Sequence, residues 1–237
     1  MHIVKRTLLV TGASSGIGRA IARQLLQAGH TVIGGSRDCS QFMVKHHNFS
    51  SIELDLSQLE KIPAQLKALE KAFPTLDGVI FSAGYGQFGA IEQFSFAQIE
   101  QMINVNFTSQ AFITRALIPN LKRKPHSNLI YIGSEAALKG SRKGSIYCAS
   151  KFALRGFTQA LTDECGSSSV RISLINPGMV KTHFFDKLSF QPGDAETQGL
   201  LAEDIAQAVN YILNSNNNMV IDEINLNPPN KVIRFKK

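Results

Sequence analysis

The sequence predicts an α/β fold in which helices cover both faces of a parallel β-sheet. Two observations carry this prediction. Short apolar runs alternate with helix-length amphipathic stretches along the chain of 237 residues, and the apolar runs are continuous instead of alternating with polar residues. Continuous apolar strands that alternate with helices are typical of a parallel sheet buried on both faces.

Seven apolar runs are predicted to be strands and five amphipathic stretches are predicted to be helices. The strands are Thr7–Val10, Thr31–Gly34, Ser51–Leu54, Asp77–Phe81, Asn128–Ile132, Val170–Ile175 and Met219–Ile224. The helices cover residues 17–28, 58–72, 96–118, 145–165 and 202–213. Two of these helices start with a capping-box pattern, which pairs Ser57 with Glu60 and Ser95 with Gln98.

Two segments do not fit this alternation. Residues 38–50 are polar and weakly patterned, so neither a helix nor a strand is assigned to them. Residues 183–200 contain Pro192 and Gly193 and lack a regular period. A long irregular insert in a compact domain is usually a functional or a mobile loop, and we expect this one to lie at the substrate.

The composition is that of a globular protein with a substantial core, because 43% of the residues are hydrophobic and 18% are charged. No apolar run approaches the length of a membrane span, and the N-terminal apolar stretch is too short for a secretory signal. We therefore expect a cytoplasmic protein that does not associate with membranes. Cys39, Cys148 and Cys165 are far apart, which favours free thiols over a disulfide framework or a zinc site.

The net charge of +7 allows three kinds of partner: nucleic acid, a membrane surface or an anionic ligand. The basic residues are scattered, with small clusters at residues 122–124 and 231–237. No recognised nucleic-acid module accompanies them. A solvated surface together with a phosphate-bearing ligand is therefore the favoured interpretation, and no nucleic-acid partner is expected.

The first predicted strand runs into a glycine-rich turn, Thr11–Gly18, and a helix follows it directly. Glycine lets the chain turn sharply and lets backbone N–H groups approach a pyrophosphate. The helix N-terminus adds a partial positive charge that favours an anion. Glycine-rich turns also serve as simple connections, but the position of this one favours a dinucleotide-binding turn.

Tyr147 and Lys151 lie four positions apart in a predicted helix, so they share one helix face. A nearby ammonium favours the phenolate and lowers the phenol pKa, which would make Tyr147 a usable acid–base group. Ser134 follows the fifth strand at the edge where open α/β sheets bind ligands. Taken singly, the pair could be a core aromatic beside a surface lysine, and Ser134 could be a helix cap.

Taken together, these motifs resemble the short-chain dehydrogenase/reductases over nearly the whole chain. The turn at residues 11–18 resembles the cofactor turn of that family, and Asp55 with Leu56 resembles its adenine-contacting segment. Asn106 resembles the catalytic asparagine, and Ser134, Tyr147 and Lys151 resemble the rest of its catalytic tetrad. The segment at residues 176–182 resembles the nicotinamide-contacting segment that follows the sixth strand.

The resemblance implies a doubly wound Rossmann fold, with a seven-stranded parallel sheet in the order 3-2-1-4-5-6-7 and one domain over residues 1–237. It also implies an oxidoreductase that interconverts a carbonyl and an alcohol with NADP(H). Tyr147 would be the general acid/base, Ser134 would polarise the carbonyl, Lys151 would bind the nicotinamide ribose, and Asn106 would hold a water linked to the lysine. No metal is needed, because these groups and the cofactor supply the chemistry. The implied cofactor-binding residues are Gly12, Ser14, Ser15, Gly16, Ile17, Gly18, Arg37, Asp55, Leu56, Ala83, Gly84, Tyr147, Lys151, Pro177, Gly178, Val180 and Thr182.

The chain departs from the family pattern after its fourth strand. Ser82 stands where the family often has an asparagine that braces the sheet. Gly84 still permits close approach of the backbone to a cofactor. We therefore expect the bracing to differ and the fold to be unchanged.

The end of the second strand bears on the choice between NAD and NADP. An acidic residue there would accept hydrogen bonds from a free 2′-hydroxyl and repel a 2′-phosphate. A count of about 20 residues from Gly18 reaches Asp38, which favours NAD. The family pattern places the discriminating position at Ser36, and Arg37 then falls where NADP-preferring members carry a basic residue. An arginine can clamp a phosphate with charge-assisted bonds, so NADP(H) is predicted.

Two other functions remain open at this stage. The chain could be a catalytically weak redox sensor that binds NADP in the same fold, or it could be a nucleic-acid-binding module. The complete set of Ser134, Tyr147 and Lys151 argues against a sensor, and the absence of stacking aromatics at a recognised spacing argues against the second. The substrate is expected to be a small carbonyl compound or alcohol. The segments expected to select it are residues 85–95, 135–146 and 183–200.

A homodimer or homotetramer is also predicted. The stretches 95–118 and 145–165 carry Phe96, Phe107, Phe112, Phe152 and Phe157. One sheet face cannot cover so much apolar surface, so the excess would be buried against another copy of the chain. The resemblance points the same way, since family members commonly assemble through these helices.

Overall fold

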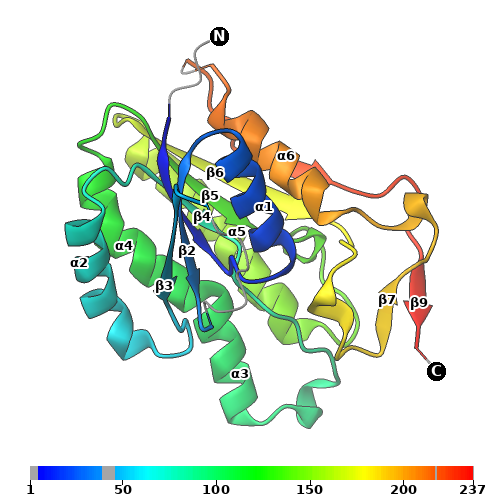
Figure 1. Cartoon of the computed structure of the whole chain (residues 1–237). Coiled ribbons are helices and arrows are strands. Elements are labelled where there is room, and N and C mark those ends of the chain that lie inside the picture. The colour runs from blue at the N-terminus through cyan, green and yellow to red at the C-terminus, as the bar shows by residue number, and fades with distance from the viewer. Residues whose placement is uncertain (1–4, 39–45, 217, 237) are drawn as a thin grey trace.

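The structure is a computed structural model that describes residues 5–38, 46–216 and 218–236. A parallel sheet of seven strands forms its centre (Figure 1), in the order β3-β2-β1-β4-β5-β6-β8. The strands of this sheet are β1 (Thr7–Thr11), β2 (Thr31–Ser36), β3 (Phe49–Glu53), β4 (Gly78–Phe81), β5 (Ser127–Ile132), β6 (Val170–Pro177) and β8 (Glu223–Leu226). The predicted Rossmann fold and its strand order are confirmed, with β8 as the seventh strand of the sheet.

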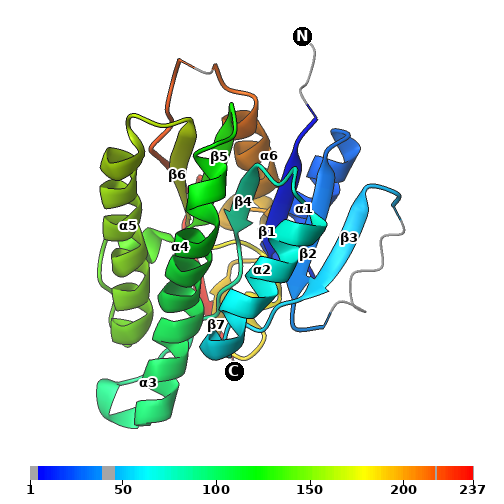
Figure 2. The same ribbon diagram turned by 90° about the vertical axis from the view of Figure 1, so that its left-hand side faces the viewer.

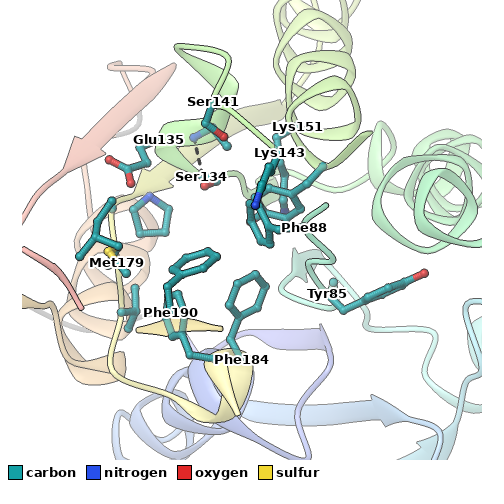
Figure 3. A pocket seen from close by; sticks show the side chains of 18 of the residues that line it. Tyr85, Phe88, Ser134, Glu135, Ser141, Lys143, Lys151, Met179, Phe184 and Phe190 are labelled. Atoms are coloured by element: carbon teal, nitrogen blue, oxygen red, sulfur yellow. Dashed lines mark hydrogen bonds between the residues drawn. The ribbon is translucent and has the colours of Figure 1, made fainter. Parts of the chain in front are cut away.

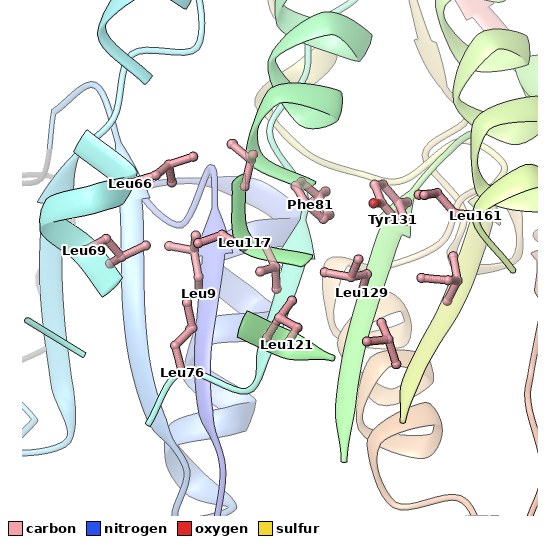
Figure 4. Packing of buried hydrophobic residues seen from close by; sticks show 14 of the residues in the cluster. Leu9, Leu66, Leu69, Leu76, Phe81, Leu117, Leu121, Leu129, Tyr131 and Leu161 are labelled. Carbon is pink, nitrogen blue, oxygen red and sulfur yellow. The ribbon is translucent and has the colours of Figure 1, made fainter. Parts of the chain in front are cut away.

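Helices cover both faces of the sheet (Figure 2). On one face lie α2 (Ile62–Ala72), α4 (Ser109–Leu121) and α5 (Ser145–Cys165), and on the other lie α1 (Gly16–Gln27) and α6 (Ala202–Leu213). Each face has its own apolar cluster. The cluster beneath α2, α4 and α5 joins Leu66, Leu117 and Leu161 to strand residues such as Leu9 and Leu129 (Figure 4).

Strands β1, β2 and β4 end close together at their carboxyl ends. Thr11 at the end of β1 lies opposite Gly35 of β2 and Phe81 of β4. The strand order reverses between β1 and β4, which is where ligands bind in open α/β sheets. The turns that follow these two strands therefore flank the position expected for a ligand.

A single long helical stretch contains a π turn. α3 (Phe96–Ile103) continues into a π turn at Asn104–Thr108 and then into α4. The flanking residues Ile103 and Ser109 both keep right-handed helical backbone angles. The helix predicted over 96–118 is therefore present, and the π turn within it was not predicted. The capping box of Ser95 with Gln98 is confirmed.

The predicted substrate segment is partly ordered. It contains a 3-10 turn at His183–Phe185, the short strand β7 (Phe190–Pro192) and a second 3-10 turn at Glu196–Gln198. β7 pairs antiparallel with β9 (Ile233–Phe235) near the C-terminus, and Figure 1 shows this pair beside the main sheet. The C-terminal chain therefore folds back along the substrate segment.

Two local predictions were wrong. The capping box of Ser57 with Glu60 does not form, because the hydroxyl of Ser57 donates to Asp55 and the 3-10 turn at Leu59–Lys61 precedes α2. The last strand was predicted over Met219–Ile224 but lies at Glu223–Leu226.

Part of the unassigned segment 38–50, including Cys39, lies outside the described residues, and β3 begins at Phe49. In the described ranges, no helix combines the length and the apolar character needed to cross a membrane.

Candidate active site

The glycine-rich turn after β1 has no room for a side chain at two of its glycines. Gly12 has a φ of 70°, and a Cβ built there would lie 2.9 Å from Cα of Ala83. A Cβ built at Gly18 would lie 2.3 Å from the carbonyl oxygen of Gly12. The turn therefore packs directly against the segment after β4. Ser14, Ser15, Gly16 and Ile17 complete it at the N-terminus of α1.

Thr11 braces the segment after β4. Its hydroxyl oxygen accepts hydrogen bonds from the backbone N–H groups of Ser82, at 3.1 Å, and Ala83, at 3.2 Å. This contact ties the end of β4 to the end of β1 where the family pattern often has an asparagine. The hydroxyl of Ser82 is buried at the wall of the cavity and has no hydrogen-bond partner within the described part of the chain.

Tyr147, Ser134 and Lys151 line one cavity. α5 carries Tyr147 and Lys151 on the same face, and the Lys151 Nζ lies 5.9 Å from the centre of the Tyr147 ring. Ser134 follows β5 and caps a 3-10 turn at Glu135–Ala137, where its Oγ accepts from the N–H of Ala136 at 3.1 Å. Ser134 is thus both a cap and a cavity residue, so the two interpretations of this serine are compatible.

The pKa of Tyr147 differs from the expectation that Lys151 would lower it. Burial raises the pKa of Tyr147 to about 12, because the phenolate would lose its hydration, and a hydrogen bond with Ser134 offsets only part of this rise. Burial also lowers the pKa of Lys151 to about 8. The phenol is therefore protonated at neutral pH, and it is held next to a serine hydroxyl.

Lys151 is held by the main chain of β5. Its Nζ donates to the carbonyl oxygen of Ile132 at 3.0 Å, and the side chain is buried. A Cβ built at Gly84 would lie 3.7 Å from this Nζ. The ammonium therefore sits between the end of β5 and the segment after β4.

Asn106 lies in the π turn and is fully buried. Its side chain makes hydrogen bonds with the backbone N–H and C=O of Tyr85 and donates to the Ser150 hydroxyl, at distances of 3.0, 2.9 and 3.1 Å. Gln110 donates to the backbone oxygen of Asn106 at 2.8 Å. Widening of a helix at a π turn leaves such carbonyls available to side chains. Asn106 thus fixes the Tyr85 segment against α5.

Sequence reasoning missed a polar network behind Ser134, of which Asn176 is the buried member. The Oδ1 of Asn176 accepts from the backbone N–H of Ser134 at 3.3 Å. The amide nitrogen of Asn176 donates to Glu223 at 2.8 Å and to Asn225 at 3.0 Å. Glu223 in turn forms an ion pair with Arg155 of α5. Residues of β6, β8 and α5 therefore set the position of the serine.

The segment after β6 lies at the same cavity. Pro177, Gly178, Val180 and Thr182 all line it, together with Ile17 and Gly84. Gly178 is fixed by a 2.7 Å hydrogen bond from its N–H to the carbonyl of Leu226, and Thr182 caps the next 3-10 turn. A Cβ built at Gly16 would lie 3.6 Å from the Cβ of Thr182. The turn at the start of α1 and this segment therefore meet at one edge of the cavity.

The predicted cofactor residues Gly12, Ser14, Ser15, Gly16, Gly18 and Ala83 are not in the lining of this cavity. Three further ones lie at the ends of β2 and β3 and do not line it either. Arg37 is exposed after β2. Although partial burial of Asp55 opposes its charge, hydrogen bonds from Ser57 and Gln58 and the nearby charge of Arg37 lower the pKa of Asp55. The side chain of Leu56 is buried in the apolar core, so only its backbone can meet a ligand.

The cavity has a volume of about 750 Å³ and a largely aromatic wall on the side of Tyr147. Phe88, Phe184 and Phe190 gather around one space in Figure 3. Phe184 and Phe190 belong to the segment 183–200 and Phe88 to the segment 85–95, both of which were expected to select the substrate. Among the described residues, no group of three or more His, Cys, Asp or Glu side chains is arranged to hold a metal ion.

A family model described as short chain dehydrogenase matches residues 6–192. The chain belongs to the short-chain dehydrogenase family. It is therefore an oxidoreductase by family, with the nucleotide-binding Rossmann fold of these proteins.

Two relatives among the short-chain dehydrogenases match almost from end to end. An uncharacterized oxidoreductase of Staphylococcus aureus strain MRSA252 is 30% identical over 231 residues, which are 95% of this chain and 98% of the relative. Another, from Staphylococcus epidermidis strain RP62A, is 29% identical over 230 residues, with the same shares of the two chains.

Solved short-chain dehydrogenase structures are similar as well. The alcohol dehydrogenase of the archaeon Thermococcus sibiricus, complexed with 5-hydroxy-NADP, superposes with a TM-score of 0.84 at 26% identity, over 94% of this chain and 96% of that one. The serine dehydrogenase of Escherichia coli gives a TM-score of 0.80 at 26% identity, over 93% and 96% of the two chains.

Proposed function

We propose that this short-chain dehydrogenase interconverts a carbonyl and an alcohol on a small molecule by hydride transfer with NADP(H), and that Tyr147 is its general acid/base. One observation carries the proposal. A protonated phenol, a serine hydroxyl and a buried ammonium line a single cavity. The segment after β4, which also lines this cavity, packs against the glycine-rich turn, where Gly12 has no room for a side chain.

The residues at the edge of the cavity fit a dinucleotide. The turn from Gly12 to Gly18 offers backbone N–H groups and a helix N-terminus to a pyrophosphate. The unpaired Ser82 hydroxyl and the segment from Pro177 to Thr182 line the place where a nicotinamide would lie. When bound, the nicotinamide would supply or accept the hydride at carbon.

The chain's own groups would handle the proton. With its pKa raised by burial, Tyr147 holds its proton at neutral pH and can donate it from Oη to the oxygen of a substrate carbonyl. Ser134, held by Asn176, would hydrogen-bond the same oxygen and polarise the carbonyl. In the reverse direction, Tyr147 would accept the proton of the alcohol.

Lys151 and Asn106 would position the other groups. Lys151 would hold the ribose hydroxyls next to the nicotinamide, and its charge would stabilise the phenolate that proton donation leaves. Asn106 fits a positioning role, because its side chain is engaged by Tyr85 and Ser150. The implied water linked to Lys151 would have to be held by other atoms of this site.

The proposed preference for NADP rests on Arg37. Arg37 is exposed at the end of β2 and would meet a 2′-phosphate there, and the T. sibiricus structure is a complex with 5-hydroxy-NADP. Asp55 lies close enough to interact with the charge of Arg37. We propose that a phosphate competes with Asp55 for this guanidinium.

The test of the mechanism is Tyr147→Phe, which removes the proton donor and keeps the ring. NADPH oxidation should be measured with a panel of activated ketones, quinones and 3-keto acids or esters. Turnover of a good substrate should fall at least ~100-fold, the lower end of general acid–base contributions, while NADPH affinity stays nearly constant. Tyr211→Phe, on an exposed tyrosine of α6, is the matched control and should behave as wild type.

Two outcomes would contradict the proposal. Activity retained by Tyr147→Phe would exclude the tyrosine as the proton donor. NADPH binding by the wild type without reduction of any member of the panel would favour the redox sensor instead.

A further inference from the structure

Five aromatic side chains form a closed ring at the substrate side of the cavity. Ring centres are 5.3 Å apart for Tyr147 and Phe88, 5.0 Å for Phe88 and Phe190, and 5.8 Å for Phe190 and Phe185. Phe184 closes the ring, at 5.1 Å from Phe185 and 5.9 Å from Tyr147. All five line the cavity. A substrate body beside Tyr147 therefore meets aromatic surface, where a polar body would lose its hydrogen bonds to water.

A short basic loop, residues 139–143, borders the same cavity. Lys139, Arg142 and Lys143 are exposed and also belong to the cavity lining. The backbone of Lys143 has a φ of 62°, which is uncommon for a residue with a side chain, and its carbonyl accepts a 2.8 Å hydrogen bond from the N–H of Gly89. The loop is therefore docked onto the chain next to Phe88.

The charges of the basic loop are not balanced by acidic neighbours. Glu135 is the one carboxylate among the described residues that line the cavity, and it forms an ion pair with Lys231. Lys139, Arg142 and Lys143 take part in none of the ion pairs found in the described ranges of the chain. A cavity mouth that carries unbalanced positive charges beside an apolar wall attracts anions.

Phe88 connects the two features. Its ring contacts the ring of Tyr147, and a Cβ built at Gly144, next to the basic loop, would lie 3.3 Å from the Phe88 Cε1. Figure 3 shows Phe88 and Lys143 on the same side of the cavity. A molecule whose reacting carbon lies at Tyr147 can therefore run along Phe88 toward the basic loop.

We propose that the substrate is an amphipathic anion, whose apolar body packs in the aromatic ring and whose carboxylate or phosphate group meets Lys139, Arg142 and Lys143. This proposal rests on the proposed function, which places the reacting carbonyl at Tyr147. It adds that the charge at the far end of the substrate is a determinant of recognition.

The experiment compares matched ketones that differ in charge. para-Acetylbenzoate carries a carboxylate, and para-acetylbenzamide is its neutral analogue. Binding of each is measured by calorimetry on the full-length protein saturated with NADP+, so that no ketone is reduced during the titration. Three exposed ion pairs, each of which should raise affinity about twofold, should together make the carboxylate bind about tenfold tighter than the amide. Added salt should reduce this difference.

The test variant carries Lys139→Gln, Arg142→Gln and Lys143→Gln together. It should bind both ketones with the affinity that the wild type shows for the amide. A control variant with Lys61→Gln, Lys67→Gln and Lys71→Gln removes the same charge from exposed positions on and beside α2, outside the cavity lining, and should keep the preference. Binding of the amide also verifies that the test variant is folded.

The proposal is overturned if the wild type binds the two ketones equally, if it binds neither, or if the test variant keeps the preference. Reduction of the same ketones by NADPH is measured separately. A preference for the anion without reduction of any ketone would leave this inference standing and refute the proposed function. Reduction of both ketones with equal KM values would support the proposed function and overturn this inference.

A third ketone distinguishes the two sources of negative charge. para-Acetylphenyl phosphate carries a larger charge on the same apolar body. Tighter binding than the carboxylate would identify a phosphorylated substrate or carrier, and weaker binding would identify a carboxylic acid. Both results support the proposal, whereas binding no tighter than that of the amide by both anions overturns it.

Discussion

Arg37 and Asp55 follow neighbouring strands, β2 and β3, and their charges interact. A ligand phosphate at this edge would gain a charge-assisted hydrogen bond from the guanidinium, and the loss of such a bond costs about 1.5–3 kcal/mol. Arg37→Ala should therefore weaken NADPH binding by that amount and leave NADH binding nearly unchanged. Titration of both nucleotides into wild type and variant measures this.

The matched control is Arg23→Ala, on an exposed arginine of α1. It should leave the affinity for both nucleotides unchanged. If the wild type binds NADH as tightly as NADPH or more tightly, Asp38 and not Arg37 reads the ribose.

The residues that line the cavity differ in how far the sequence could predict them. Ser134, Tyr147 and Lys151 were found because two share a helix face and the third follows a strand. Asn176, which lies behind Ser134, was not assigned a function, because the two residues meet although they are 42 positions apart in the sequence. Partners that meet only through the order of strands leave no local pattern.

The pKa of Tyr147 could not be predicted from the sequence either. Spacing shows that an ammonium lies nearby, but it does not show how deeply the phenol is buried. In the structure, burial is the larger effect, and it raises the pKa to about 12. A prediction made from charge alone therefore had the wrong direction.

At the scale of elements, the C-terminal strand is the main feature that sequence analysis could not find. β7 and β9 have three residues each, too few to show a period, and they pair across about 40 residues of chain. The tail is also held by backbone hydrogen bonds from Gly193 to Val232 and from Lys236 to Ser189, at 3.2 and 2.8 Å. It brings Ile233 and Phe235 to the cavity wall.

Deletion of residues 231–237 should therefore affect substrate binding more than cofactor binding. Both apolar side chains are at least half exposed, so their loss should raise the KM of a ketone about fivefold, which is equivalent to roughly 1 kcal/mol. kcat and NADPH affinity should change little. The variant with Ile233→Ser and Phe235→Ser keeps the backbone pairing and should raise KM in the same way. An unchanged KM in both variants would show that the tail is not part of the substrate wall.

In the helical stretch over residues 96–121, the apolar period predicted the helix but not the π turn inside it. A π turn adds one residue to a helical turn and barely changes the apolar pattern, so the stretch 96–118 predicted one regular helix. The structure places the turn at Asn104–Thr108, where it buries Asn106. The position of the asparagine thus depends on an irregularity that no pattern indicated.

At the scale of the whole molecule, the sheet could be predicted because most of its strands are short apolar runs separated by helices. The last strand was misplaced because Met219–Ile224 is the more apolar stretch, yet Met219 and Val220 are exposed. Pairing with β6 selects Glu223–Leu226 instead, which brings Glu223 and Asn225 to Asn176. Tertiary contacts therefore decided between two overlapping segments.

The five phenylalanines of α3, α4, α5 and the π turn differ in whether they are packed against the core or exposed. Phe107 and Phe157 pack edge to face, 5.7 Å apart, against the core under α4 and α5. Phe96, Phe112 and Phe152 are exposed to 93%, 40% and 44% on α3, α4 and α5. Two of the five residues therefore pack against the core, and three are exposed on α3, α4 and α5, helices that lie side by side in Figure 2.

Three exposed phenylalanines on neighbouring helices favour a homo-oligomer that buries this face. Light scattering at micromolar concentration should give a mass that is a multiple of 26.0 kDa. Phe112→Glu combined with Phe152→Glu places charges on both helices, and burying them unpaired would cost more than the contact gains. This variant should have a mass of 26.0 kDa with unchanged circular dichroism. Tyr211→Glu, on the opposite face in α6, should keep the wild-type mass. A monomeric wild type would show that the outer face of α4 and α5 is not an interface.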